Sequence, residues 1–308
     1  STQGVSSAAS DVYKRQLMQS GLFSEMVLID ADTNRAEGEA MDISHGISFA
    51  RPMQIYAGSY DDIADAAIIV ITAGANQKPG ETRLDLIKKN AAIMKSIVGE
   101  IKKRDFGGIL LIVSNPVDIL TLIALKESGY PANRVIGSGT VLDTGRFKYL
   151  LGEHLAIDSR SVHAFIIGEH GDSELAAWSN ATIGGLSVNE FCELRGHFNH
   201  EASMKRIFDD VKNSAYEIIE RKHATYYGIA MAVKRICEAI VRNEKSILPV
   251  SSLMTGEYGL NDVVLSIPSV VGETGVEKVV PIGLNDDEMS ELRKSADILK
   301  NIAADYIS

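Results

Sequence analysis

The residues best suited to chemistry lie in short polar stretches that follow apolar runs. IGEHGDSE (167–174) places His170 between a glutamate and a glycine, just past an apolar run. A histidine in such a turn at a strand end can act as a general acid/base, and it then needs an acid to fix its tautomer. LDTGR (142–146) places Asp143 and Arg146 three apart at a helix start, and therefore on one face of the helix. The alternatives are a structural histidine and a helix cap beside an exposed arginine.

Two more stretches could bring polar side chains to the same region. TAGANQKPGETR (72–83) joins an apolar run to an amphipathic helical pattern and is long for such a connection. It is either a lid that carries Gln77 and Arg83 inward when it closes, or a mobile surface loop. SNPVD (114–118) follows another apolar run, and the proline disfavours helical backbone at Asn115, so that its amide can point across the strand end. A plain Asn-Pro turn is the alternative there.

Asp30 ends the apolar run VLID (27–30). An acid at the tip of the second strand of a dinucleotide-binding fold accepts hydrogen bonds from the ribose hydroxyls of adenosine, which favours NAD over NADP. A cap on the following helix is the alternative, and this residue alone leaves the two open.

Composition excludes several classes of function. The chain has 308 residues and a formal net charge of −10, so it can form no broad basic surface for nucleic acid. Its longest apolar runs hold roughly seven residues, against the ~20 that a membrane span needs. Cys192 and Cys237 have no metal-binding spacing and suit a reducing compartment, and His163 and His170 would point to opposite faces of an extended run. We therefore expect no nucleic-acid partner, no membrane partner and no catalytic metal.

The order of apolar runs predicts an α/β fold. Runs that are apolar on both faces alternate with helical patterns in the first half of the chain, which indicates a doubly wound parallel sheet covered by helices. Ligands of such sheets gather at the carboxyl ends of the strands. The second half mixes strands, turns and helices, so we divide the chain into domains at 1–138 and 139–308. The expected parallel strands are 26–30, 67–74, 108–114 and 134–139.

Five segments occur in order with domain-scale spacing: DADTNRAEGEAMDISHG, TAGANQKPGETRLDLIKKN, SNPVDI, GSGTVLDTGRF and IIGEHGDSE. They resemble bacterial L-lactate dehydrogenases, within the lactate/malate dehydrogenase superfamily, and the resemblance runs from about Leu17 to the C-terminus. It implies a Rossmann-type doubly wound parallel sheet followed by an α+β catalytic domain. It also implies a cytoplasmic enzyme of fermentative glycolysis, which transfers a hydride reversibly between (S)-lactate and pyruvate with NAD as cofactor.

Carried over to this sequence, the resemblance gives roles to the polar residues above. His170 would be the general acid/base, Asp143 would orient its imidazole and stabilise the imidazolium, and Arg83 would polarise the ketone carbonyl. Arg146 would clamp the substrate carboxylate in a bidentate pair that a lysine cannot supply. The remaining substrate-binding positions would be Asn115 at the substrate oxygen and Thr225 at the side-chain pocket.

Gln77 separates two close relatives within the resemblance. Malate dehydrogenases of the superfamily carry an arginine here, which pairs with the second carboxylate of their substrate. A neutral amide would leave that carboxylate unpaired in a closed site, which is costly. The resemblance therefore favours lactate and pyruvate, with a malate or other 2-hydroxyacid dehydrogenase as the alternative.

The resemblance also implies a cofactor site, an activator site and an oligomer. Bacterial members are often homotetramers activated by fructose 1,6-bisphosphate, which an arginine and a histidine bind between subunits. His163 matches that histidine, and Lys148 stands at the arginine position, which keeps the charge without the fork. The expected NAD-binding residues are Asp30, Arg35, Tyr60, Gly74, Ala75, Ser96, Val113, Ser114, Asn115 and Ser138.

STQGVSSAASDVYKRQ (1–16) does not fit the start of such a fold. The resemblance requires about 20 residues here: a buried strand, G-x-G-x-x-G and most of a helix. The stretch has one glycine, four serines and no apolar run. We expect it to be displaced sequence, so that the sheet lacks its first strand and the cofactor's pyrophosphate lacks its glycine-rich loop. A binding-only or structural chain with the same fold is the alternative that this stretch leaves open.

Overall fold

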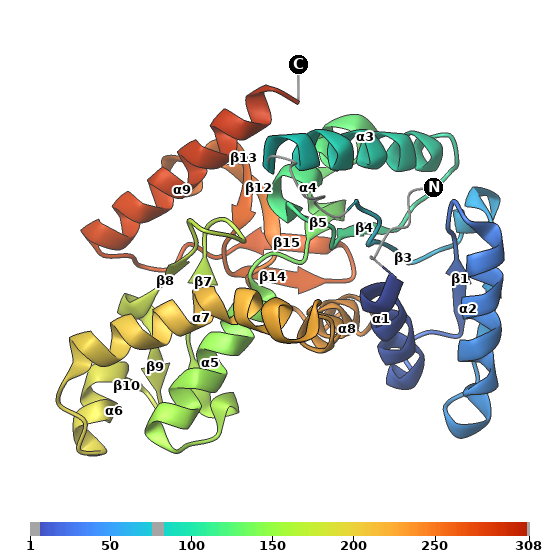
Figure 1. Ribbon diagram of the computed structural model, residues 1–308. Helices are drawn as coiled ribbons and strands as arrows, with labels where there is room; N and C mark the ends of the chain where they lie inside the picture. Colours follow the sequence, from blue (N-terminus) through green and yellow to red (C-terminus); the bar gives the residue numbers. More distant parts are fainter. Residues whose placement is uncertain (1–6, 76–82, 307–308) are drawn as a thin grey trace.

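The computed structural model describes residues 7–75 and 83–306. Helices cover both faces of a largely parallel sheet, and a region of short strands and further helices follows (Figure 1). The helices are α1 (Ser7–Ser20), α2 (Thr33–His45), α3 (Arg83–Lys102), α4 (Val117–Ser128), α5 (Val141–Leu155), α6 (Val188–Leu194), α7 (His200–Lys222), α8 (Tyr227–Val241) and α9 (Asp286–Ala304). The strands are β1 (Glu25–Leu28), β2 (Gln54–Ala57), β3 (Ile68–Ile71), β4 (Ile109–Ile112), β5 (Val135–Gly137), β6 (Val162–His163), β7 (Ile166–Ile167), β8 (Leu175–Ala176), β9 (Thr182–Ile183), β10 (Leu186–Ser187), β11 (Ser246–Leu248), β12 (Ser251–Thr255), β13 (Asn261–Ser266), β14 (Ser269–Gly272) and β15 (Gly275–Val279).

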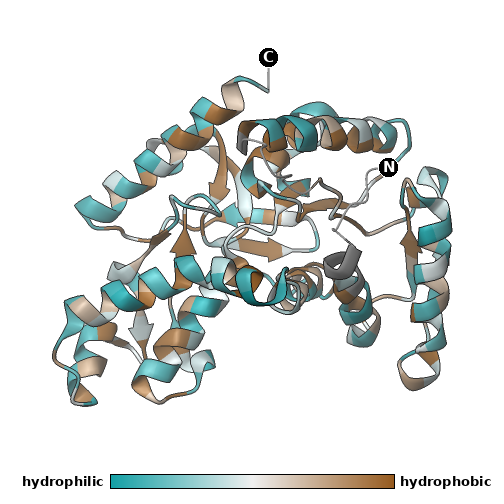
Figure 2. Ribbon diagram, viewed as in Figure 1, coloured by the Kyte–Doolittle hydropathy of each residue, from teal (hydrophilic) through white to brown (hydrophobic). Residues whose placement is uncertain are grey.

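Strand β4 lies inside the main sheet because its side chains are apolar on both faces. Leu110 and Ile112 pack in one core with residues of α3 and α4, and Ile109 and Leu111 pack in another with residues of α8. The sheet order is β13-β12-β5-β4-β3, in which β3, β4 and β5 run parallel. Figure 2 shows these strands as a largely apolar centre with polar residues on the outer sides of the helices. The expected doubly wound arrangement is confirmed.

Strands β1 and β2 form a separate two-stranded parallel sheet. In a Rossmann sheet the strand order is 3-2-1-4-5-6, so the first strand lies between the second and the fourth. Here β2 and β1 match strands 3 and 2, while β3, β4 and β5 match strands 4, 5 and 6. Within 7–75 and 83–306 no segment takes the place of strand 1. For this part of the chain, the expectation of a missing first strand is confirmed.

The helical state of residues 7–16 was not expected from their composition. Helix α1 extends back to Ser7, although the stretch has no apolar run. Tyr13 and Leu17 lie one helical turn apart and are both buried, and Leu17 packs in a core with Ile236 and Ile240 of α8. A helix needs only such a stripe of buried positions to pack, so an unbroken apolar run is not required.

The second half of the chain has its own core and also contributes to the main sheet. Phe147, Leu151 and Leu155 of α5 are fully buried beneath the small antiparallel sheet β10-β9-β6. Strands β12 and β13, by contrast, extend the parallel sheet, with Ser251 of β12 opposite Gly137 of β5. The division at 138 and 139 stays a prediction. Among the residues described, no helix combines the length and apolar character required to cross a membrane.

We expect backbone amides of β1 and β2 to exchange hydrogen roughly tenfold or more faster than those of β4, which corresponds to ~1.4 kcal/mol of opening free energy. The reason is that a two-stranded sheet is only marginally stable and that neither strand is buried throughout, whereas all four residues of β4 are. Native-state hydrogen exchange followed by mass spectrometry measures this. Equal protection of the two sheets would contradict the expectation.

Candidate active site

His170 lies directly after β7, in a segment that returns to pair with β8. Gly168 starts this turn with φ of +89°, a conformation that favours glycine. A Cβ on Gly168 would also lie 3.0 Å from the hydroxyl of Ser295 on α9. The glycine therefore permits both the turn and the close approach of α9, and the expected position of His170 past an apolar strand is correct.

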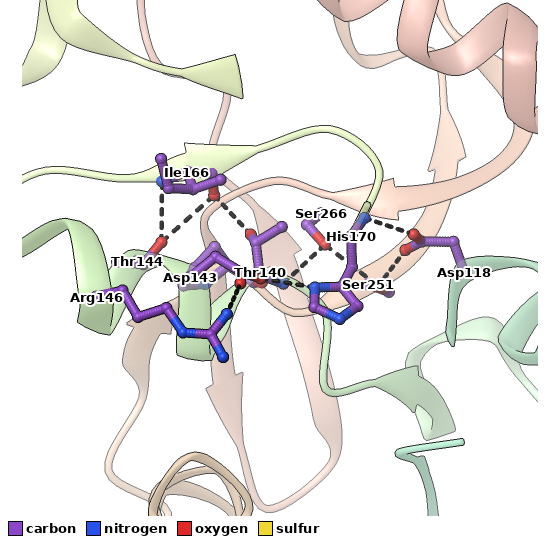
Figure 3. Close-up of polar contacts among 10 residues, drawn as sticks. Asp118, Thr140, Asp143, Thr144, Arg146, Ile166, His170, Ser251 and Ser266 are labelled. Carbon is purple, nitrogen blue, oxygen red and sulfur yellow. Dashed lines mark hydrogen bonds and ion pairs between the residues drawn. The ribbon is translucent and has the colours of Figure 1, made fainter. Parts of the chain in front are cut away.

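The imidazole of His170 is hydrogen-bonded to Asp143 of helix α5, with 2.6 Å between Nδ1 and Oδ2 (Figure 3). The other carboxylate oxygen, Oδ1, accepts a 2.7 Å hydrogen bond from Nη1 of Arg146. Burial alone would raise the pKa of Asp143, but His170 and Arg146 hold it below its usual value. Asp143 and Arg146 lie on one helical face, as their spacing predicted.

The same pair determines the charge on the histidine. Burial alone would lower the pKa of His170, but the nearby carboxylates, Asp143 first and then Asp118 and Glu174, together raise this pKa to about 9. Because Nδ1 is engaged by Asp143, Nε2 is the nitrogen left to face a reactant. At neutral pH the site thus presents a protonated imidazole, which is a proton donor.

Asp118, which the sequence analysis did not single out, fixes the backbone of the reacting histidine. Its Oδ2 accepts a 2.8 Å hydrogen bond from the backbone N–H of His170, and its Oδ1 accepts one of 2.5 Å from the hydroxyl of Ser251. Burial raises the pKa of Asp118 to about 6. The only signal in the sequence was its place in the first turn of a helix after SNP, which many acids share.

Two threonines tie helix α5 to strand β7, so that Asp143 and His170 meet. The hydroxyl of Thr140 donates to the carbonyl of Ile166 at 2.5 Å, and the backbone N–H of Ile166 donates to the hydroxyl of Thr144 at 2.9 Å (Figure 3). Both threonines are buried. Each of these contacts joins residues more than twenty positions apart in the sequence, so no local sequence pattern predicts them.

Glu174 is a third acid at this site that was missed in the sequence. It lies four positions after His170 and is 6% exposed. One of its carboxylate oxygens lies within 4.8 Å of a ring nitrogen of His170 and of a carboxylate oxygen of Asp143. Burial, and then the Asp143 carboxylate, raise the pKa of Glu174 to about 8. Its place in the same polar turn as His170 was a signal in the sequence, but the sequence does not show that its side chain lies near the histidine.

The expected cofactor residues lie mainly at the carboxyl ends of the parallel strands, as sheets of this type require. Asp30 follows β1, and Asp32, not Asp30, caps helix α2 by accepting from the backbone of Arg35. The cap interpretation of Asp30 is therefore wrong, and its exposed carboxylate accepts only from the Asp32 backbone among described residues. The other expected residues at strand ends are Gly74 and Ala75 after β3, Val113, Ser114 and Asn115 after β4, and Ser138 after β5.

Asn90 of helix α3, also absent from the sequence-based set, joins two of these strand ends. Its Oδ1 accepts a 2.7 Å hydrogen bond from the backbone N–H of Ala75, and its Nδ2 donates to the carbonyl of Asn115 at 2.9 Å. The Asn115 side chain is exposed and hydrogen-bonds to none of the residues described, so its amide remains available. The interpretation of Asn115 as a presented amide is thus compatible with the structure.

The remaining expected residues stay predictions. Gln77 lies outside the described residues, and Arg83 begins helix α3 with its side chain outside the description. Thr225 is half-buried between α7 and α8. His163 on β6 is exposed and Lys148 on α5 is half-buried, and the described part of the chain shows no contact between them. Arg35 lies on α2, Tyr60 stacks 5.6 Å from the guanidinium of Arg104, and Ser96 is exposed on α3.

Both halves of the chain match domains of one family of known proteins. Residues 3–137 match the lactate/malate dehydrogenase NAD binding domain, and residues 140–307 match the lactate/malate dehydrogenase alpha/beta C-terminal domain. The L-lactate dehydrogenase of Acetivibrio thermocellus is 56% identical over 286 residues, which cover 93% of this chain and 90% of that protein.

Solved structures agree closely with the fold. A lactate dehydrogenase from a Medee basin deep-sea metagenome library has a TM-score of 0.95 at 46% identity, covering 99% of this chain and 97% of that chain. The ligand-bound minor L-lactate dehydrogenase of Enterococcus mundtii has a TM-score of 0.93 at 44% identity, covering 96% and 94%. The chain therefore belongs to the lactate/malate dehydrogenase family.

Proposed function

We propose that this chain is an NAD-dependent L-lactate dehydrogenase, which interconverts (S)-lactate and pyruvate. The observation that carries the proposal is the 2.6 Å pair of His170 and buried Asp143, with Arg146 beside it, in a chain 56% identical to an L-lactate dehydrogenase. This is a proton donor next to a cation that can hold a carboxylate, which is what a 2-oxoacid needs.

The residues that would hold NAD fit the cofactor at the strand ends. The exposed Asp30 carboxylate uses Oδ1 for the backbone of Asp32 and keeps Oδ2 for the ribose hydroxyls of adenosine. Gly74, Ala75 and Ser138 also lie at carboxyl ends of the parallel strands. When bound, NAD supplies the hydride acceptor or donor. Residues 7–24 provide no glycine-rich loop for its pyrophosphate, since they contain one glycine, Gly21, which follows α1.

The chain's own residues would manage the proton and the substrate anion. In the direction of reduction, His170 holds a proton at Nε2 and gives it to the carbonyl oxygen, while Asp143 stabilises the charged imidazole before transfer. Arg146 uses Nη1 toward Asp143 and keeps its other guanidinium nitrogens for the substrate carboxylate. In oxidation, neutral His170 takes the hydroxyl proton of lactate. No metal is needed for these steps, and the expectation of none stays a prediction.

Replacing His170 by alanine should lower kcat by ~10²–10⁴-fold in both directions, because the proton donor and acceptor is lost. Affinity for NADH, measured by the change in its fluorescence, should remain within a few-fold of the unmodified chain. Near-normal kcat in H170A would remove the acid/base assignment.

The NADH titration of the unmodified chain decides the second candidate function. The separate β1–β2 sheet favours a chain that has the fold but binds the cofactor poorly. If circular dichroism shows a folded chain and NADH does not bind, the chain is a binding-impaired member of the fold and not an active dehydrogenase.

Substrate choice within the family would rest on Gln77. We expect Gln77→Arg to raise the ratio of kcat/KM for oxaloacetate to that for pyruvate by roughly 10- to 100-fold, since a charge-assisted hydrogen bond to the second carboxylate is worth roughly 1.5–3 kcal/mol. Steady-state kinetics with both substrates measures this. Gln77→Lys provides a control for charge without the bidentate fork. An unchanged ratio in Q77R would contradict the assignment.

We further propose a cytoplasmic homotetramer that responds to fructose 1,6-bisphosphate. Two buried free cysteines fit a reducing compartment, and the exposed apolar side chains Tyr216, Ile219, Tyr227 and Met231 on α7 and α8 fit self-association. The activator would bind His163 and Lys148 at a subunit contact. Burial lowers the pKa of Lys148 from its usual value. A lysine also lacks the bidentate fork with which an arginine would hold a phosphate.

Fructose 1,6-bisphosphate should lower KM for pyruvate by about tenfold, a coupling of ~1.4 kcal/mol, and His163→Ala should remove this effect without changing kcat. Initial rates at low pyruvate, with sedimentation velocity to follow assembly, provide the measurement. An H163A variant that responds to the bisphosphate like the unmodified chain would exclude His163 from the activator site.

A further inference from the structure

Glu174 is a buried acid whose side chain lacks a hydrogen-bond partner among the described residues. Its backbone N–H donates to the carbonyl of Gly171 at 3.1 Å, but within the described part of the chain its side chain, 6% exposed, has no hydrogen-bond partner. The neighbouring acid Glu169 differs, because its Oε2 accepts a 2.5 Å hydrogen bond from Ser173. A buried carboxyl group without a partner is costly when it is charged, so its ionisation must be linked to nearby groups.

The groups that face Glu174 come from three elements and include the reacting histidine. Asp143 on α5 and His170 in the same turn each have an atom within 4.8 Å of a carboxylate oxygen of Glu174. Arg146 on α5 and Lys212 on α7 add positive charge near this carboxyl group. Burial and Asp143 raise the pKa of Glu174 to about 8, and His170, Lys212 and Arg146 oppose this only in part. Near pH 7 most Glu174 carboxyls are therefore neutral.

His170 and Glu174 influence each other because each favours the charged form of the other. A Glu174 carboxylate raises the pKa of His170, together with the larger effect of Asp143 and that of Asp118. Groups this close lose their protons in steps that belong to the pair. Once the pair has lost one proton, a Glu174 carboxylate beside a charged His170 imidazolium is favoured over two neutral groups, because opposite charges within 4.8 Å attract each other.

We propose, on the basis of the function proposed above, that Glu174 is a positioning residue for the transferable proton. As the medium turns alkaline, its carboxyl group ionises first, and the resulting carboxylate keeps the proton on His170. Pyruvate reduction, which needs the protonated imidazole, thus continues to higher pH than the Asp143–His170 pair alone would allow.

The test is the pH profile of Glu174→Gln in both reaction directions. Reduction needs protonated His170, so kcat/KM for pyruvate in the unmodified chain stays high below pH 8 and falls as pH rises through about 9. In E174Q the fall should occur about one pH unit lower, since a nearby acid shifts a pKa by roughly that amount. Oxidation needs neutral His170, so the rise of kcat/KM for lactate should move to lower pH by the same amount.

The controls separate this role from a structural one. Loss of packing alone would lower both rates at every pH and leave the midpoints in place. Asp172→Asn removes an exposed acid from the same turn and should shift neither midpoint. Glu174→Asp, which withdraws the carboxyl group by one methylene, should give a smaller shift in the same direction, and it replaces E174Q if that variant does not fold. Superimposable profiles for E174Q and the unmodified chain would overturn the inference.

A measurement without turnover distinguishes failure of this inference from failure of the proposed function. The imidazole of His170, labelled with ¹⁵N and assigned by its loss in H170A, can be titrated by NMR in the chain without substrate. A lower midpoint in E174Q supports the role of Glu174 even if no lactate dehydrogenase activity is found. An unchanged midpoint contradicts it whatever the activity is.

Discussion

The hydrogen bond between the carboxylate of Asp143 and the imidazole of His170 is the interaction on which the rest of the site depends. It joins helix α5 to the turn after β7, two segments that Thr140 and Thr144 also tie together through the backbone of Ile166. A carboxylate buried to this degree would be unstable without cations, and His170 and Arg146 supply them. In the proposed function, the same three groups would provide the proton and the carboxylate-binding cation that a 2-oxoacid requires.

Charge balance in the site extends beyond this trio. Asp118 on α4 holds the backbone of His170, and burial raises the pKa of Asp118 to about 6, so that its carboxylate is mostly ionised near neutral pH. Glu174 has the opposite state near neutral pH because its pKa lies at about 8. Two acids near one imidazole thus differ in protonation since one has hydrogen-bond donors and the other has none among described residues.

The cofactor side of the molecule depends on a different constraint, the continuity of the sheet. Strands β3, β4 and β5 align their carboxyl ends, and Asn90 ties the segments after β3 and β4 together. Among the described residues, strands β1 and β2 pair only with each other, and Asp30 follows β1. The part proposed to bind adenosine is therefore connected to the main sheet through helices and loops, whereas His170 and Asp143 lie beside the main sheet.

The sequence by itself determined the family, the parallel strands and the trio of Asp143, Arg146 and His170. The strands and the shared face of Asp143 and Arg146 follow from local information, namely apolar runs and helical spacing. The resemblance supplied the family and the pairing of Asp143 with His170. The sequence also predicted that the sheet lacks its first strand, which is confirmed for the described residues, because residues 1–16 contain neither a glycine-rich turn nor an apolar run.

Only the tertiary structure decided which other acids take part. Asp118 and Glu174 are ordinary acids in sequence, and their roles arise from contacts with α5, β12 and the turn after β7. The structure also decided that Asp32 rather than Asp30 caps α2, and that residues 7–16 are helical. For the two acids and for residues 7–16 the deciding factor is packing between distant segments, which sets burial and hydrogen-bond partners and cannot be read from neighbours in sequence. The cap on α2 depends on where the helix begins, which the structure places at Thr33.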